Sequence, residues 1–254
     1  VGAEVTLCGE AALSSRGAAA TRDPVNVRGA SRSGSLGALG MTSPRLTLLV
    51  ENRTGYKNLC RLITAGALGK PKGEAFVSLD QVAAHAEGLH CLTGGDEGLV
   101  AKALAEGGLE AAGGLLDSLS EIFAGRLHVE LQRHRLAAQE HRNVALVDLA
   151  RRRRLPLLAS TGVRYARARD KELHDVLTCI RHHTTLDKAG SLLAAQRERH
   201  FQTAAAMQRR FADLPDTVDA SLALAERLDF TLADLGYRFP AYPLPPGETP
   251  SSYL

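Results

Sequence analysis

Residues 126–161, "RLHVELQRHRLAAQEHRNVALVDLARRRRLPLLAST", predict a strand, a helix and a second strand in direct succession. Apolar and polar residues alternate over 126–132, as is typical of a strand. The pattern over 137–154 indicates an amphipathic helix, and 155–161 is a short apolar run that indicates a buried strand. A strand, a helix and a strand in this order form a crossover between parallel strands. The stretch therefore favours an α/β fold built on a parallel sheet or barrel.

The same alternation of strands and helices extends to both sides of this stretch. Further strands are predicted at 1–7, 45–52 and 89–95, and further helices at 54–68, 78–88, 97–108, 109–125 and 170–183. Thr54 and Ser78 are the predicted N-caps of the first two helices.

Two stretches of the chain break this rhythm. The long polar stretch 9–44 is expected to be a surface loop or insertion. Strands stop near residue 186, after which two helices and a Pro-rich extended segment are predicted. We therefore expect a domain over 1–185 and a helical connection over 186–254.

Composition excludes several classes of protein. The 254 residues are 44% hydrophobic with no Trp, so the chain can bury a core of mainly Leu, Ala and Val. The formal net charge of +3 permits a nucleic-acid partner without indicating one. The four cysteines are widely spaced, which argues against a zinc knuckle or disulfide scaffold and suits the reducing cytoplasm. No signal peptide or apolar run of membrane-spanning length is present. Since the chain starts at Val1 and ends without a helix stop signal, we expect a fragment.

Three polar clusters are candidate sites. His128 and Glu130 share one face of a predicted strand, with His134 and His141 nearby, and they are either a metal site or surface residues on a polar edge. The pair His182 and His183 suits a helix C-terminus better than a chelating role. The run Arg151 to Arg154 either closes a helix before Pro156 or binds phosphate, as in DNA. No dinucleotide, P-loop or serine-nucleophile motif is present.

An ordered set of segments resembles one known family, the polymerase-and-histidinol-phosphatase (PHP) domain of bacterial C-family DNA polymerases, the relatives of the polymerase III alpha subunit. The segments are "RLTLLVENRTGYKNLCRLIT" (45–64), "GLHCLTGGDEG" (88–98), "LHVELQRH" (127–134), "LPLLASTGVRYA" (155–166) and "LHDVLTCIRHHTTLDKAG" (173–190). The tail from "ERHF" (198–201) onward resembles the connection from that domain to the polymerase core. The segments "TGVRYA" (161–166) and "ERHF" (198–201) resemble in sequence the error-prone branch of this polymerase family.

The resemblance implies a distorted (β/α)7 PHP-type barrel in which His, Asp, Glu and Cys side chains at strand ends hold a metal cluster. Of the ligand positions within this chain, only the glutamate is retained, as Glu4. A histidine position is Arg45, a cysteine position is Gly95, and an aspartate and a histidine position are Gly162 and Arg164. Arginine has no lone pair to offer and glycine has no side chain, so the resemblance implies neither a metal nor catalytic residues here. Fixed positive charge could instead balance Glu4.

The resemblance implies a parent protein that is an error-prone DNA-directed DNA polymerase, acting in DNA replication, repair and translesion synthesis. Its Mg²⁺-dependent core would lie outside this chain, which would be an inactive scaffold. Its expected partners are DNA, a sliding clamp and other damage-response proteins.

Two alternative functions remain open. One is a metal-dependent phosphoesterase or proofreading enzyme using Glu4, His128, His134 and His141. The other is a basic DNA-binding module working through the arginine-rich segment 126–154.

Overall fold

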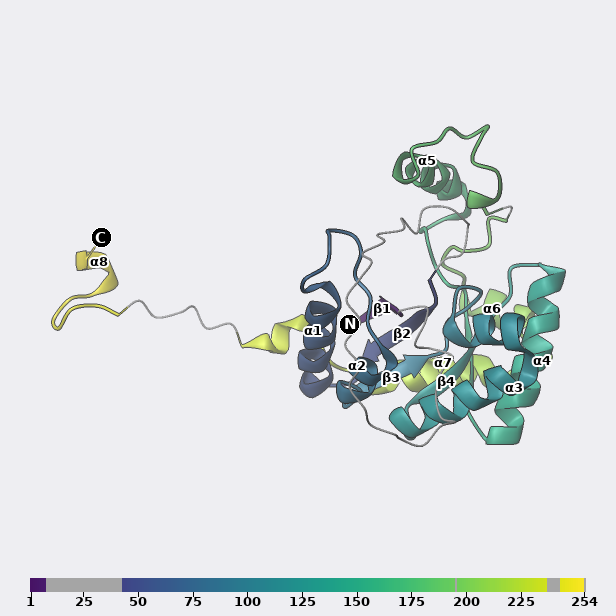
Figure 1. Ribbon diagram of the computed structural model, residues 1–254, viewed down its shortest axis with the longest axis horizontal. Helices are drawn as coiled ribbons and strands as arrows, with labels where there is room; N and C mark the ends of the chain where they lie inside the picture. The colour runs from purple at the N-terminus through teal and green to yellow at the C-terminus, as the bar shows by residue number, and fades with distance from the viewer. Residues whose placement is uncertain (8–42, 195, 237–242, 254) are drawn as a thin grey trace, which may run out of the picture.

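The computed structural model describes residues 1–7, 43–194, 196–236 and 243–253, in which five strands form one sheet (Figure 1). The strands lie in chain order and are β1 (Gly2–Thr6), β2 (Arg45–Val50), β3 (Leu89–Leu92), β4 (Leu127–Gln132) and β5 (Leu157–Ser160). The helices of the described residues are α1 (Arg53–Ala67), α2 (Leu79–Ala84), α3 (Leu99–Ile122), α4 (Ala137–Arg153), α5 (Lys171–Arg181), α6 (Ala204–Arg210), α7 (Asp216–Arg227) and α8 (Pro250–Tyr253). The expected α/β fold is confirmed.

The strand directions differ from those of a purely parallel sheet. β3, β4 and β5 are parallel, as the crossover pattern predicts, but β1 pairs antiparallel with β2, and β2 pairs antiparallel with β3. The kinked α3 and the helix α4 connect the parallel pairs, and α1 and α2 lie between β2 and β3. Because β2 runs opposite to β3, the start of β2 lies at the same edge of the sheet as the ends of β3, β4 and β5.

One large apolar core joins the sheet to the helices. Side chains from all of β1 to β5 contribute to it together with residues of α1 to α4. Its largest fully buried members include Phe123, which follows α3, and Phe211, which follows α6. Phe230, beyond α7, stacks on Tyr56 of α1 with ring centroids 5.1 Å apart. The core therefore extends into the segment that follows residue 186.

Helix α7 covers the outermost strand of the sheet. The Ser221 hydroxyl donates to the carbonyl oxygen of Ala159 in β5 at 2.7 Å. Leu224 of α7 packs with Leu92 and Leu158 in a small second cluster. Because neighbouring residues of a strand point to opposite faces, this cluster lies on the face of β3 opposite to Cys91. An unpaired strand edge promotes association with other chains, and α7 protects β5 from this.

The helix boundaries correct one prediction and confirm others. Asn52, not Thr54, caps α1, and its side chain accepts from the backbone N–H of Gly55 at 3.0 Å. Ser78 caps α2 as predicted, in a capping box with Gln81. The two helices predicted at 97–108 and 109–125 are confirmed as the two parts of α3, which is broken between them at Gly108, whose φ of +68° only glycine adopts readily. The two helices predicted after residue 186 are confirmed as α6 and α7.

Some expectations lie outside the described residues. These are most of the predicted loop 9–44 and part of the Pro-rich segment, residues 237–242. Within the described part of the chain, no helix combines the length and the apolar character that crossing a bilayer requires.

Candidate functional site

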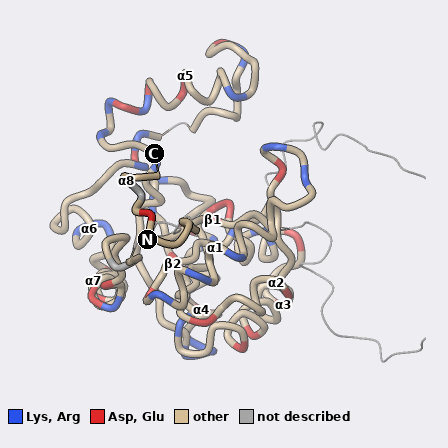
Figure 2. The backbone as a smooth tube through the Cα atoms, turned by 90° about the vertical axis from the view of Figure 1, so that its left-hand side faces the viewer, with Lys and Arg blue, Asp and Glu red and all other residues tan. Residues whose placement is uncertain are grey.

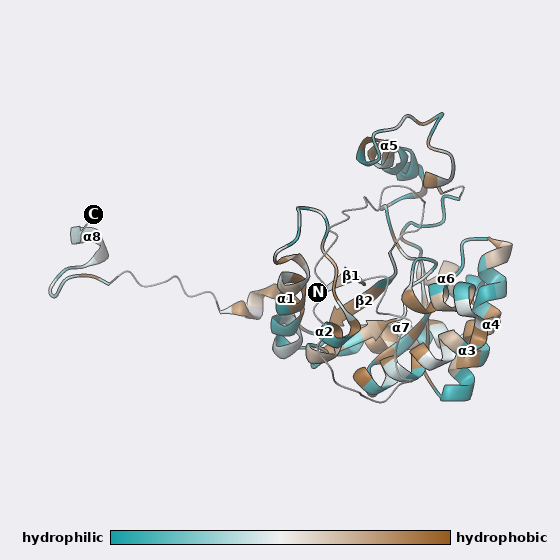
Figure 3. Ribbon diagram, viewed as in Figure 1, coloured by the Kyte–Doolittle hydropathy of each residue, from teal (hydrophilic) through white to brown (hydrophobic). Residues whose placement is uncertain are grey.

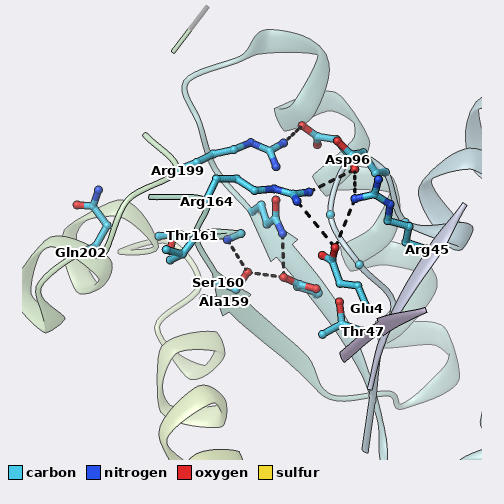
Figure 4. Close-up of a pocket in the computed structure, with 18 of the residues that line it drawn as sticks. Glu4, Arg45, Thr47, Asp96, Ala159, Ser160, Thr161, Arg164, Arg199 and Gln202 are labelled. Atoms are coloured by element: carbon cyan, nitrogen blue, oxygen red, sulfur yellow. Dashed lines mark hydrogen bonds and ion pairs between the residues drawn. The ribbon is translucent and has the colours of Figure 1, made fainter. Parts of the chain in front are cut away.

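A cavity of about 440 Å³ opens at the edge of the sheet where β3, β4 and β5 end and β2 begins. Ligands in α/β folds commonly bind at such carboxyl ends of strands. The cavity is lined by all of the positions that the resemblance singles out, Glu4, Arg45, Gly95, Gly162 and Arg164. Figure 4 shows the labelled members of this set converging from segments far apart in the chain.

Two arginines and two glutamates form a closed set of ion pairs at the mouth of the cavity. The guanidinium of Arg45 lies 3.4 Å from the Glu4 carboxylate and 3.0 Å from that of Glu97. The guanidinium of Arg164 lies 3.9 Å from Glu4 and 3.3 Å from Glu97 (Figure 4). We call these four side chains the arginine–glutamate ring. Its formal charges cancel, and it joins β1, β2 and the loops that follow β3 and β5.

The ring side chains are partly solvated, with exposed fractions between 30% for Arg164 and 47% for Glu4. Water and salt weaken each single ion pair at this depth, so one pair contributes about 1 kcal/mol or less. Because each carboxylate faces two guanidinium groups, removal of one arginine leaves both carboxylates with one partner. The ring is therefore a network rather than a sum of isolated pairs.

The side chain of Gln132, at the end of β4, fills the space that glycine leaves at two of the ligand positions. A Cβ atom added at Gly95 would lie 2.2 Å from Gln132 Oε1. One added at Gly162 would lie 2.7 Å from the same amide. Gly162 also has a φ of +51°, which disfavours any other residue. A cysteine at 95 or an aspartate at 162 would therefore require Gln132 to move.

Below the ring lies a buried carboxylate, that of Glu130. Its Oε1 accepts a hydrogen bond from Gln132 Nε2 at 2.8 Å and another from the Ser160 hydroxyl. The backbone N–H of Glu130 donates to the hydroxyl of Thr93. Gln132 Oε1 is buried and has no hydrogen-bond partner among the residues that the structure describes. The floor of the cavity is thus polar and held mainly by uncharged donors.

Asp96 ties a distant segment to the side of the cavity. One of its oxygens accepts from Arg142 of α4 and from the Gln139 amide, and the other accepts from Arg199 at 3.3 Å. His134 supports the loop after β5, because its Nε2–H donates to the Thr161 carbonyl at 2.9 Å. Burial lowers the pKa of His134, and the bond to that carbonyl partly opposes the shift.

These residues do not fit a metal cluster. Among the described residues, no group of three or more His, Cys, Asp or Glu side chains is arranged to hold a metal ion. In the cavity, guanidinium groups meet the Glu4 carboxylate, and the Gln132 amide occupies the space next to Gly95 and Gly162. A divalent cation needs several anionic or neutral oxygen, nitrogen or sulfur donors, and a guanidinium group offers none. No metal chemistry is therefore assigned to this cavity.

The histidines considered as metal ligands do not converge. His128 lies against His90 of β3, with 3.3 Å between His128 Nε2 and His90 Nδ1, and His141 is exposed on α4. The reading of His128 and Glu130 as surface residues is wrong, because β4 is buried along its whole length. Burial lowers the pKa of His128 to about 4. His182 and His183 do lie where α5 ends, as expected.

The run Arg151 to Arg154 does close α4, and Arg154 adopts a left-handed conformation at the C-cap. Arg152 pairs with Asp148 at 2.9 Å, and Arg153 pairs with Asp117 at 2.8 Å. Figure 2 shows basic and acidic residues interspersed along α4. Half of the run is thus paired with carboxylates of its own chain.

Sequence reasoning missed part of the cavity. Asp96 and Glu97 follow the strand end "LTGG", so their position after β3 was a usable signal. Gln132 ends β4 and Arg199 comes from a segment assigned to the connection, and no local pattern marks either of them.

Comparison with known proteins shows which family this chain is similar to. The family model described as "PHP domain" matches residues 1–134. "DNA polymerase III subunit alpha" of Pseudomonas aeruginosa is 34% identical over 212 residues, and this match covers 83% of this chain and 18% of that protein. "Error-prone DNA polymerase" of Pseudomonas syringae pv. tomato is 38% identical over 213 residues, covering 83% of this chain and 20% of that protein. The protein of the same name from Mycolicibacterium paratuberculosis is 36% identical over 214 residues, covering 83% of this chain and 20% of that protein.

The chain thus spans about a fifth of the length of these relatives. From its match to the family model and its α/β fold, the chain belongs to the PHP domain family.

Proposed function

We propose that this chain is a segment of a longer, error-prone DNA-directed DNA polymerase, in which it acts as a structural support. The observation that carries the proposal is the arginine–glutamate ring at the strand ends, where the family resemblance places a metal cluster. The names of the matched relatives support the polymerase part of the proposal. Nucleotide addition would take place in a Mg²⁺-dependent core outside these 254 residues.

In this role the ring takes over the structural role that a bound metal has in a metal-containing site. A metal cluster holds strand ends and loops together through shared ligands. Here Glu4, Glu97, Arg45 and Arg164 connect the same kind of segments through shared charges. In this proposal Glu4 is a vestigial ligand with a structural partner, and none of the described residues that line the cavity has a catalytic role.

We propose residues 1–185 as the PHP domain and 186–254 as the connection toward the polymerase core. The packing of Phe211 and Leu224 against the sheet supports a connection that is fastened to the domain rather than a free linker. DNA is the proposed substrate of the parent protein, a sliding clamp and other damage-response proteins are its proposed partners, and the cytoplasm is its proposed location. A direct DNA contact through Arg151 to Arg154 belongs to the same proposal. Of these four side chains, those of Arg152 and Arg153 already pair with carboxylates of the chain.

The experiment has two arms. The longer polypeptide encoded by the same reading frame should extend a primed template with Mg²⁺, and the 254-residue chain should not. The 254-residue chain should also release no phosphate from DNA ends or nucleotides when supplied with Mn²⁺ or Zn²⁺, and elemental analysis should find less than stoichiometric metal.

Each arm has an outcome that refutes its part. A reading frame that yields no nucleotide addition would refute the polymerase assignment. Stoichiometric zinc or manganese together with metal-dependent phosphate release would refute the structural role and establish the phosphoesterase alternative. Loss of that release in Glu4→Gln, with the exposed Glu110→Gln on α3 as the matched control, would locate the activity in the cavity.

A further inference from the structure

Helix α5 is oriented with its polar face toward the protein and its apolar face toward solvent. Figure 1 shows it standing off from the sheet and the helices that cover it. On its inner face, Lys171 pairs with Asp175 and both are largely buried, and the His174 ring lies 5.6 Å from that of Tyr165. Cys179 is the buried apolar residue of this face.

The outer face of α5 carries four apolar side chains at positions i, i+3, i+4 and i+7, the spacing of one helix face. Their exposed fractions are 63% for Leu173, 40% for Val176, 55% for Leu177 and 64% for Ile180. Figure 3 shows hydrophobic residues on this helix, away from the main core. A soluble helix normally buries this stripe, so a contiguous exposed stripe of this kind marks an interaction surface.

We infer that the outer face of α5 docks onto an apolar surface of the same polypeptide, outside these 254 residues. The inference rests on the proposed function, because it requires the longer chain. About four-fifths of each matched relative lies outside the segment that this chain spans, so a covering surface within one polypeptide has ample chain to come from.

The size of the α5 face favours an intrachain partner over a second copy of the chain. The four side chains expose on the order of a few hundred Å². A stable complex between separate proteins buries roughly 800 Å² on each partner. A contact within one polypeptide needs less surface, because the linker supplies a high effective concentration.

The test measures hydrogen exchange of the α5 amides in the 254-residue chain and in the longer polypeptide. We expect exchange about tenfold slower or more in the longer polypeptide, since docking adds protection to helix amides that otherwise open locally. The variant Leu177→Lys/Ile180→Lys should remove this difference without affecting the fold, because both side chains are more than half exposed. The matched control, Val144→Lys, changes a side chain that is 72% exposed on α4 and should leave the difference intact.

Three outcomes would overturn the inference. These are equal exchange rates in the two polypeptides, protection that survives Leu177→Lys/Ile180→Lys, and a dimer of the 254-residue chain that this variant abolishes. Primer extension by the same samples separates the two proposals. Slower exchange without nucleotide addition supports the docking and refutes the polymerase, whereas nucleotide addition with equal exchange rates does the reverse.

Discussion

Acid should weaken this fold over a defined pH range, because His128 is buried in its neutral form. Burial, together with the neighbouring His90 and Arg227, lowers the pKa of His128 from 6.5 to about 4. In the unfolded chain the imidazole regains its ordinary pKa, so between these two values the unfolded state binds more protons. The contribution of His128 to stability is therefore complete above about pH 6.5, falls as the pH drops, and stops falling below about pH 4.

The size of the effect follows from the difference between the two pKa values. About 2.5 pH units correspond to about 3 kcal/mol of unfolding free energy, of which about 2 kcal/mol is lost between pH 7.5 and pH 5. Burial also lowers the pKa of His90. Glu51, 3.4 Å from His90 Nε2, favours its protonated form, whereas Arg227 and Arg126 oppose it.

Urea unfolding at pH 7.5 and at pH 5 measures this loss. In His128→Gln the amide cannot titrate, so the drop in unfolding free energy between the two pH values should be smaller by about 2 kcal/mol. His141→Gln, on the exposed face of α4, is the matched control and should behave like the unmodified chain. An equal drop in His128→Gln and in the unmodified chain would refute the reasoning.

Three further predictions concern single side chains. Arg164→His removes one member of the arginine–glutamate ring and should lower the unfolding free energy by about 1 kcal/mol; an unchanged melting temperature would contradict the ring's structural role. Gly95→Ala forces its Cβ against Gln132 and should cost about 1–3 kcal/mol, and Gln132→Ala in the same chain should recover part of it in urea unfolding. Asn52→Ala should cost about 1 kcal/mol in thermal unfolding through loss of the α1 cap, and Thr54→Ala, inside the first turn, should cost clearly less.

The sequence predicted the elements better than their arrangement. Periodicity identified β4, α4 and β5 to within two residues at each end, because apolar spacing depends on local geometry. It carries no information on strand direction, and so the antiparallel pairing of β2 with β3 was not predicted. One of the two readings of His128 and Glu130 in β4, surface residues on a polar edge, was likewise wrong. The face of the strand that carries them is covered by residues distant in sequence, and its polar groups bond to one another.

The residues of the cavity were likewise easier to predict than the contacts between them. The positions of Glu4, Arg45 and Arg164 were singled out by resemblance, since each occupies a recognisable place in a motif. Positive charge balancing Glu4 was also expected, and Arg45 and Arg164 both pair with it. The place of Glu97 in the ring was not predicted, because the side chains of two arginines can reach many acceptors. Arg199 was missed since its partner Asp96 lies 103 residues away.

The arginine–glutamate ring consists only of side chains encoded in the chain itself. A protein whose strand ends are joined by a metal can complete its fold only when the cell supplies the ion, and a chelator loosens it. Here the ring can form as soon as Arg164 has been synthesised and the strands have paired. The stability of these contacts between strand ends depends on ionic strength and not on metal supply, because counterions screen partly exposed ion pairs. EDTA should thus leave the melting temperature unchanged, and concentrated NaCl should weaken the ring.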